Sequence, residues 1–89
     1  MNLDSAAIVC EHVASGAPIL FARRDESVED EDSGWQFSCN SVPKENPNNA
    51  KVWLLREILA QEPSLSNYLM LPSGAELSRS SSSSLWTVK

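Results

Sequence analysis

The chain of 89 residues has only one histidine, two cysteines and three glycines. Metal-dependent and nucleophilic catalysis usually draw on several histidines or cysteines, and His12 is the only imidazole available. A structural zinc site takes four such ligands, whereas Cys10 and His12 supply two, on one face of an expected strand. No G-x-S-x-G, G-x-G-x-x-G or P-loop pattern occurs. The sequence therefore predicts no catalytic residues, no cofactor and no metal ligands.

A small secreted domain that depends on disulfides typically carries four to eight cysteines, and this chain has only Cys10 and Cys39. Each lies in a predicted strand, so two reduced thiols are expected, with a cross-strand disulfide as the alternative. Residues 1–4 lack the basic start of a signal peptide, and no run approaches the roughly 18 apolar residues of a membrane span. We expect a cytoplasmic protein that makes no contact with membranes.

Positive charge is also scarce, because 7 basic residues face 12 acidic ones and the net charge is -5. Nucleic-acid-binding proteins gain affinity from lysine and arginine that displace counterions from phosphates, so a nucleic-acid partner is not expected. Half of the acidic residues lie within one short, loop-like segment: Asp25, Glu26, Glu29, Asp30, Glu31 and Asp32. Such a segment attracts a basic partner and can mimic the phosphates that a nuclease binds, whereas a solvated loop without a specific role is the alternative.

Apolar and β-branched residues predict strands at residues 6–13, 18–24 and 34–40. Turn residues 15–18 favour an antiparallel hairpin between the first two strands. Alternation in the third strand predicts that one set of side chains faces the core: Trp35, Phe37 and Cys39. The other set faces solvent: Gln36, Ser38 and Asn40.

A helix is predicted over residues 50–61, with Asn48 or Asn49 as its N-cap. Lys51 and Arg56 belong to its solvent side. Its buried stripe has helical spacing: Val52, Leu54, Leu55, Ile58 and Leu59. Pro63 should end this helix and begin a short second helix at residues 64–71.

Two further strands are predicted at residues 75–80 and 85–89, joined by the serine run at 80–84. The expected fold is therefore α+β: one domain spanning residues 1–89, with an antiparallel sheet of about five strands in the order β-β-β-α-β-β. The main helix packs on one face of this sheet. An apolar fraction of 42% is sufficient for a folded core.

Two of the three tryptophans are candidates for contact with a partner. Trp53 lies at the edge of the helix stripe, where half-exposed aromatic side chains serve either packing or recognition. Trp86 lies near the C-terminus on a predicted edge strand, through which two copies of the chain could pair. Trp35 is expected in the core. For Trp53 and Trp86, core packing is the alternative.

Several distinct short motifs follow one another along the chain: residues 32–37 (DSGWQF), 46–49 (NPNN), 62–65 (EPSL) and 71–74 (LPSG), with Ile58-Leu59 in the helix and later Arg79 and Trp86. Together they resemble a bacterial family of immunity-protein domains from polymorphic toxin systems, first catalogued as a domain of unknown function. The resemblance covers about two-thirds of the chain. Two features depart from the family pattern: Glu62, where aspartate is more usual, and the serine run, where charged residues are expected.

The resemblance implies a protein that neutralises a cognate toxin by direct contact and is not an enzyme. We interpret the motifs as structural, because Gly34 permits a sharp turn and Trp35 and Phe37 fill a core. Contact residues are not implied by the resemblance; charge and aromatic character nominate Asp25, Glu26, Glu29, Asp30, Glu31, Asp32, Trp53 and Trp86. A housekeeping interaction module or a homodimeric assembly module, without a toxin partner, is the alternative.

Overall fold

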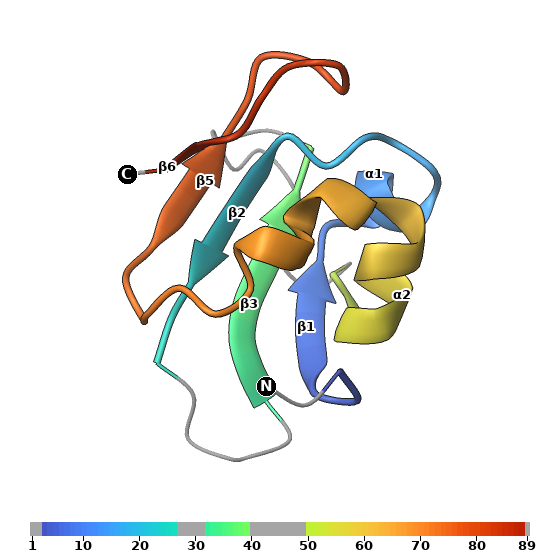
Figure 1. Ribbon diagram of the computed structural model, residues 1–89. Coiled ribbons are helices and arrows are strands. Elements are labelled where there is room, and N and C mark those ends of the chain that lie inside the picture. Colours follow the sequence, from blue (N-terminus) through green and yellow to red (C-terminus); the bar gives the residue numbers. More distant parts are fainter. Residues whose placement is uncertain (1–2, 27–31, 40–49, 89) are drawn as a thin grey trace.

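The computed structural model describes residues 3–26, 32–39 and 50–88. Within these residues, six strands form one mixed sheet in the order β4-β1-β3-β2-β5-β6, and α2 and the 3-10 helix η2 pack on one face (Figure 1). The elements are β1 (Ala6–Val9), α1 (Glu11–Ala14), β2 (Phe21–Arg24), β3 (Asp32–Ser38), β4 (Lys51–Leu54), α2 (Leu55–Gln61), η2 (Pro63–Asn67), β5 (Glu76–Ser78) and β6 (Thr87–Val88). The predicted α+β class is confirmed.

The predicted sheet of about five antiparallel strands differs from the observed one in two respects. The described residues contain six strands, and β1 runs parallel to β3 while it pairs antiparallel with β4. β2 pairs antiparallel with β3 and β5, so the predicted hairpin between the first two strands is wrong. The chain instead leaves β1 and crosses β3 before it returns as β2.

The first predicted strand ends early because Cys10 begins a helix. β1 stops at Val9, and the Val13 amide donates to the Cys10 Sγ at 3.4 Å, which caps α1. Val13 is fully buried, so α1 is anchored by core packing. Residues 11–13, which were predicted to continue the strand, are therefore helical.

Residues 51–54 form β4 instead of the first turn of the predicted helix. Val52 and Trp53 have high strand propensity, and pairing with β1 satisfies their backbone groups. The helix begins at Leu55, where the Glu57 carboxylate accepts from the Leu54 amide at 3.0 Å. Val52 is therefore 69% exposed rather than part of a buried stripe. Asn48 and Asn49 lie outside the described residues.

The predictions for the second half of the chain are closer to the structure. Pro63 follows the end of α2 and begins η2, which is shorter than the predicted second helix. The two C-terminal strands are present but short, as β5 and β6. None of the helices formed by the described residues has the length and apolar character needed to cross a membrane.

The core lies between the sheet and its helices. Trp35 and Phe37 of β3 are each 1% exposed and stack with ring centroids 5.7 Å apart, as their alternation predicted. Cys39 is half-buried against this core, and Gln36 and Ser38 lie on the opposite face. Burial of each aromatic ring contributes roughly 2–3 kcal/mol.

Arg24 and Trp35 fasten the segment after η2 to the sheet. The Arg24 Nη1 donates to the carbonyl oxygens of Leu69 and Leu71, at 3.2 and 2.8 Å. The Trp35 Nε1 donates to the same Leu69 oxygen at 3.0 Å. These bonds satisfy backbone groups that no strand or helix pairs.

Gly34 allows β3 to approach the end of β2. Its φ is +80°, and its carbonyl oxygen accepts from the Asp25 amide at 2.8 Å. A Cβ at this position would lie 2.1 Å from the Asp25 carbonyl oxygen. Both the dihedral angle and the close contact therefore require glycine.

We expect Gly34→Ala to lower the free energy of unfolding by about 3 kcal/mol or more, because a strained φ adds to a backbone clash. Gly74→Ala is the matched control, since its φ is +93° but nothing lies within 4 Å of the added Cβ. It should lose about 1–2 kcal/mol. Urea denaturation of both variants measures the difference, and equal losses would contradict the role given to the Asp25 contact.

Candidate functional site

The face of the sheet opposite α2 and η2, here named the open face, is formed by a row of side chains across five strands. Strand register aligns Val52 with Ile8, Ile8 with Gln36, Gln36 with Arg23, and Arg23 with Glu76. Val52 and Ile8 are 69% and 45% exposed and make an apolar end. Arg23 and Glu76 make the other end charged. Exposed apolar side chains bordered by polar groups are typical of a surface that binds another protein.

Acidic residues lie at the edge of the open face. The Asp25 Oδ2 accepts from Arg23 Nη2 at 3.1 Å and from Gln36 Nε2 at 2.5 Å, so the carboxylate is joined to two members of the row. Glu26 is exposed, and so is Asp32, whose Oδ1 accepts from the Gly34 amide at 2.9 Å. Asp25 therefore lies on the open face, whereas Glu26 follows it in the chain and Asp32 begins β3. The other nominated acids lie outside the described residues: Glu29, Asp30 and Glu31.

The two nominated tryptophans lie away from the open face. Trp53 of β4 aligns with the buried Ala7, is half-buried and packs against the core on the helix side. Trp86 is 9% exposed. One face of its ring lies against the Arg79 guanidinium at 4.3 Å, and its Nε1 donates to the Ser64 Oγ at 2.9 Å. These contacts occupy Trp86 within the fold.

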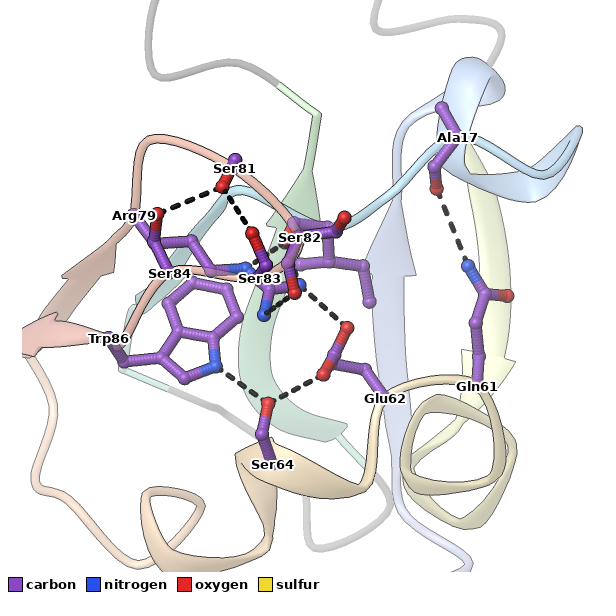
Figure 2. Close-up of polar contacts among 11 residues, drawn as sticks. Ala17, Gln61, Glu62, Ser64, Arg79, Ser81, Ser82, Ser83, Ser84 and Trp86 are labelled. Carbon is purple, nitrogen blue, oxygen red and sulfur yellow. Dashed lines mark hydrogen bonds and ion pairs between the residues drawn. The ribbon is translucent and has the colours of Figure 1, made fainter.

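Arg79 forms the centre of a polar cluster, shown in Figure 2, that is hereafter called the Arg79 cluster. Its side chain is 2% exposed, and its Nη2 contacts the Glu62 Oε1 at 2.6 Å. Nε and Nη2 both donate to the Ile19 carbonyl oxygen, at 3.0 and 2.8 Å, and Nη1 donates to that of Ser82 at 3.2 Å. The Ser64 hydroxyl donates to the Glu62 Oε2 at 2.6 Å. All three guanidinium nitrogens donate to groups of the chain itself. We therefore assign this cluster to stabilisation of the fold and not to contact with a partner.

The Glu62 pKa lies below its ordinary value. Burial alone would raise the pKa of this carboxyl group, but hydrogen bonds from Arg79 and Ser64, together with the Arg79 charge, outweigh burial and lower it. The sequence analysis named Glu62, Ser64, Arg79 and Trp86 as positions in the family resemblance, and Trp86 also as a candidate contact, without placing them together. Their convergence is a property of the tertiary structure, since they belong to the α2–η2 junction and to the C-terminal part of the chain.

The structure also gathers three residues that sequence spacing did not bring together. The Cys10 and Cys39 sulfurs and a ring nitrogen of His12 all lie within 4.8 Å of one another. Both cysteines are in the thiol form. The sequence predicted Cys10 and His12 on one face of a strand, but Cys10 caps α1 and His12 lies within that helix. Cys39 follows β3, and the parallel pairing of β3 with β1 places it beside them.

A family model described as the immunity protein Imm33 domain matches residues 7–89. This match confirms the resemblance to immunity-protein domains that the ordered motifs indicated. Comparison with curated proteins and with solved structures gave no match.

We expect Glu62→Gln to lower the free energy of unfolding by about 3 kcal/mol at pH 7, because Arg79 would remain buried without a counter-charge. Since the folded-state pKa of Glu62 is depressed, the wild-type advantage is fully present above the ordinary glutamate pKa of about 4.3. It should shrink as the pH falls through the lower, folded-state pKa.

Chemical denaturation of both proteins between pH 7 and pH 2.5 measures this dependence. Glu26→Gln, which removes the same charge from an exposed position outside the Arg79 cluster, is the matched control. A wild-type advantage over Glu62→Gln that stayed constant down to pH 2.5 would contradict the electrostatic account.

Proposed function

Because the chain belongs to the Imm33 immunity-protein domain family, we propose that it neutralises a cognate toxin by direct contact, in the cytoplasm of the bacterium that makes the toxin. The observation that carries the proposal is the family match over residues 7–89. The scarcity of histidine and cysteine supports binding rather than catalysis as the mode of action.

We assign the toxin contact to the open face, which includes Asp25, and to the other residues of the acidic segment. Ion pairs do not distinguish the two faces, because Arg56 pairs with Asp4 on the helix side and Arg23 pairs with Asp25 on the open face. The open face is chosen because it exposes Ile8 and Val52 next to each other on neighbouring strands. A protein interface needs such an apolar centre with a polar rim, which Arg23, Gln36 and Asp25 supply.

The acidic segment steers the toxin toward the open face by electrostatic attraction. A group of carboxylates at one edge of the open face attracts a basic surface and speeds its encounter, and the apolar row then holds the complex. Toxins that act on nucleic acid carry basic substrate clefts, so occlusion of such a cleft is the mode of inhibition that this arrangement suits best.

We expect Ile8→Arg to weaken the complex with the cognate toxin by about 100-fold, because a charged side chain would enter the apolar centre of the contact. Growth rescue of cells that express the toxin should fail with it. Met70→Arg is the matched control: Met70 is 70% exposed and follows η2 on the helix side. Both variants should remain folded by circular dichroism, and full rescue by Ile8→Arg would contradict the assignment.

We expect neutralisation of the acidic segment, by Asp→Asn and Glu→Gln at Asp25, Glu26, Glu29, Asp30, Glu31 and Asp32, to lower the association rate at least tenfold at low salt. Stopped-flow kinetics over a range of salt concentrations measures the effect. At high salt both proteins should associate equally fast, because screening removes the attraction. A rate unchanged at low salt would exclude a steering role.

A homodimer that pairs through the edge strand near Trp86 is the second candidate function. β6 lies at the edge of the sheet, and its two residues are exposed. An edge strand offers unpaired backbone groups to a second chain. Light scattering at several concentrations decides this, since a mass that stays monomeric throughout excludes the dimer.

A further inference from the structure

We propose that Cys10, His12 and Cys39 bind one zinc ion, with solvent as the fourth ligand. Their ligand atoms lie within 4.8 Å of one another. Across a tetrahedral zinc ion with bonds of about 2.0–2.3 Å, neighbouring ligand atoms are about 3.5–3.8 Å apart. The site therefore requires side-chain movements on the order of 1 Å, without rearrangement of the fold.

Parallel pairing of β1 and β3 creates this arrangement. Parallel strands end at the same edge of a sheet, and each of these two strands is followed closely by a cysteine. The Cys10 amide donates to the Phe37 carbonyl oxygen at 3.0 Å, which continues the pairing one residue beyond β1. Cys39 comes two residues after Phe37, so both sulfurs lie at one edge of the sheet.

Helix α1 brings His12 to the two sulfurs. It starts directly after Cys10, and its position is fixed by Val13, which is fully buried. The Val13 amide also donates to the Cys10 Sγ at 3.4 Å. Backbone N–H groups are common hydrogen-bond donors to ligating side chains, so this bond orients the Cys10 sulfur as well as capping α1.

Burial falls from one ligand to the next in a way that suits an accessible metal. Cys10 is buried, Cys39 is half-buried and His12 is exposed. One side of the site is therefore closed by protein and the other is open to water, which leaves room for a solvent ligand. An exposed histidine also provides a path by which the ion can enter.

The ligand set selects the metal. Thiolate sulfur and imidazole nitrogen favour zinc and exclude magnesium and calcium, which prefer oxygen. On binding, each thiol releases its proton to solvent, and the two thiolates balance the two positive charges of the ion. The bound ion would join the end of β1 to the end of β3, the central strands of the open face.

Titration of the untagged, fully reduced protein with Co²⁺ and with Zn²⁺ tests the proposal. We expect one cobalt ion per chain, with the near-ultraviolet charge-transfer absorption of thiolate bound to cobalt, and displacement by zinc. Excess zinc, at about 100 times its dissociation constant, should raise the Tm by roughly 10 °C.

Cys39→Ser and His12→Gln are the test variants, because neither removes a fully buried side chain. Cys39→Ser should abolish the charge-transfer absorption or reduce it by half, and His12→Gln should weaken zinc binding at least tenfold. Both should keep the wild-type circular dichroism spectrum without metal. Ser84→Ala, in the serine run remote from the site, is the control that should bind zinc normally.

Three results would overturn the proposal. The first is no cobalt–thiolate absorption in the reduced wild-type protein. The second is zinc affinity that survives both Cys39→Ser and His12→Gln. The third is a Cys10–Cys39 disulfide that resists reductant in the folded protein, since it would leave no thiolates for the metal.

Discussion

The buried guanidinium of Arg79 holds together parts of the chain that secondary structure leaves separate. It joins the segment before β2, the end of α2, the serine run and the Trp86 ring. A buried charge is tolerated only when its hydrogen-bond donors have acceptors, and each of the three guanidinium nitrogens of Arg79 donates to an oxygen. β6 has only two residues, and the Arg79 cluster adds contacts to this part of the chain through Ser82 and Trp86.

This constraint divides the molecule into a supporting side and a side available for contact. The Arg79 cluster, the Arg24 and Trp35 bonds to Leu69, and the apolar core all lie on the helix side of the sheet. The open face exposes Ile8 and Val52. Under the proposed function, this division would allow changes on the contact side that leave folding intact.

A small number of ligand-type residues does not by itself exclude a metal site. Cys10, His12 and Cys39 are all the histidine and cysteine residues of the chain, and the fold brings them to one place. Composition limits how many sites can exist, whereas topology decides whether the available residues meet. The site and the open face share β1 and β3, so the same pairing organises both.

The sequence alone determined features that depend on neighbouring residues. Pro63 ends one helix and starts the next because it lacks an N–H, and Trp35 and Phe37 share a buried face because side chains alternate along a strand. The tertiary structure decided which strands are neighbours. Residues 51–54 became a strand because β1 offered them a partner, and Cys39 reached Cys10 because β1 pairs parallel with β3. Local sequence patterns do not predict which strands pair, because the hydrogen bonds between paired strands join residues that are distant in the chain.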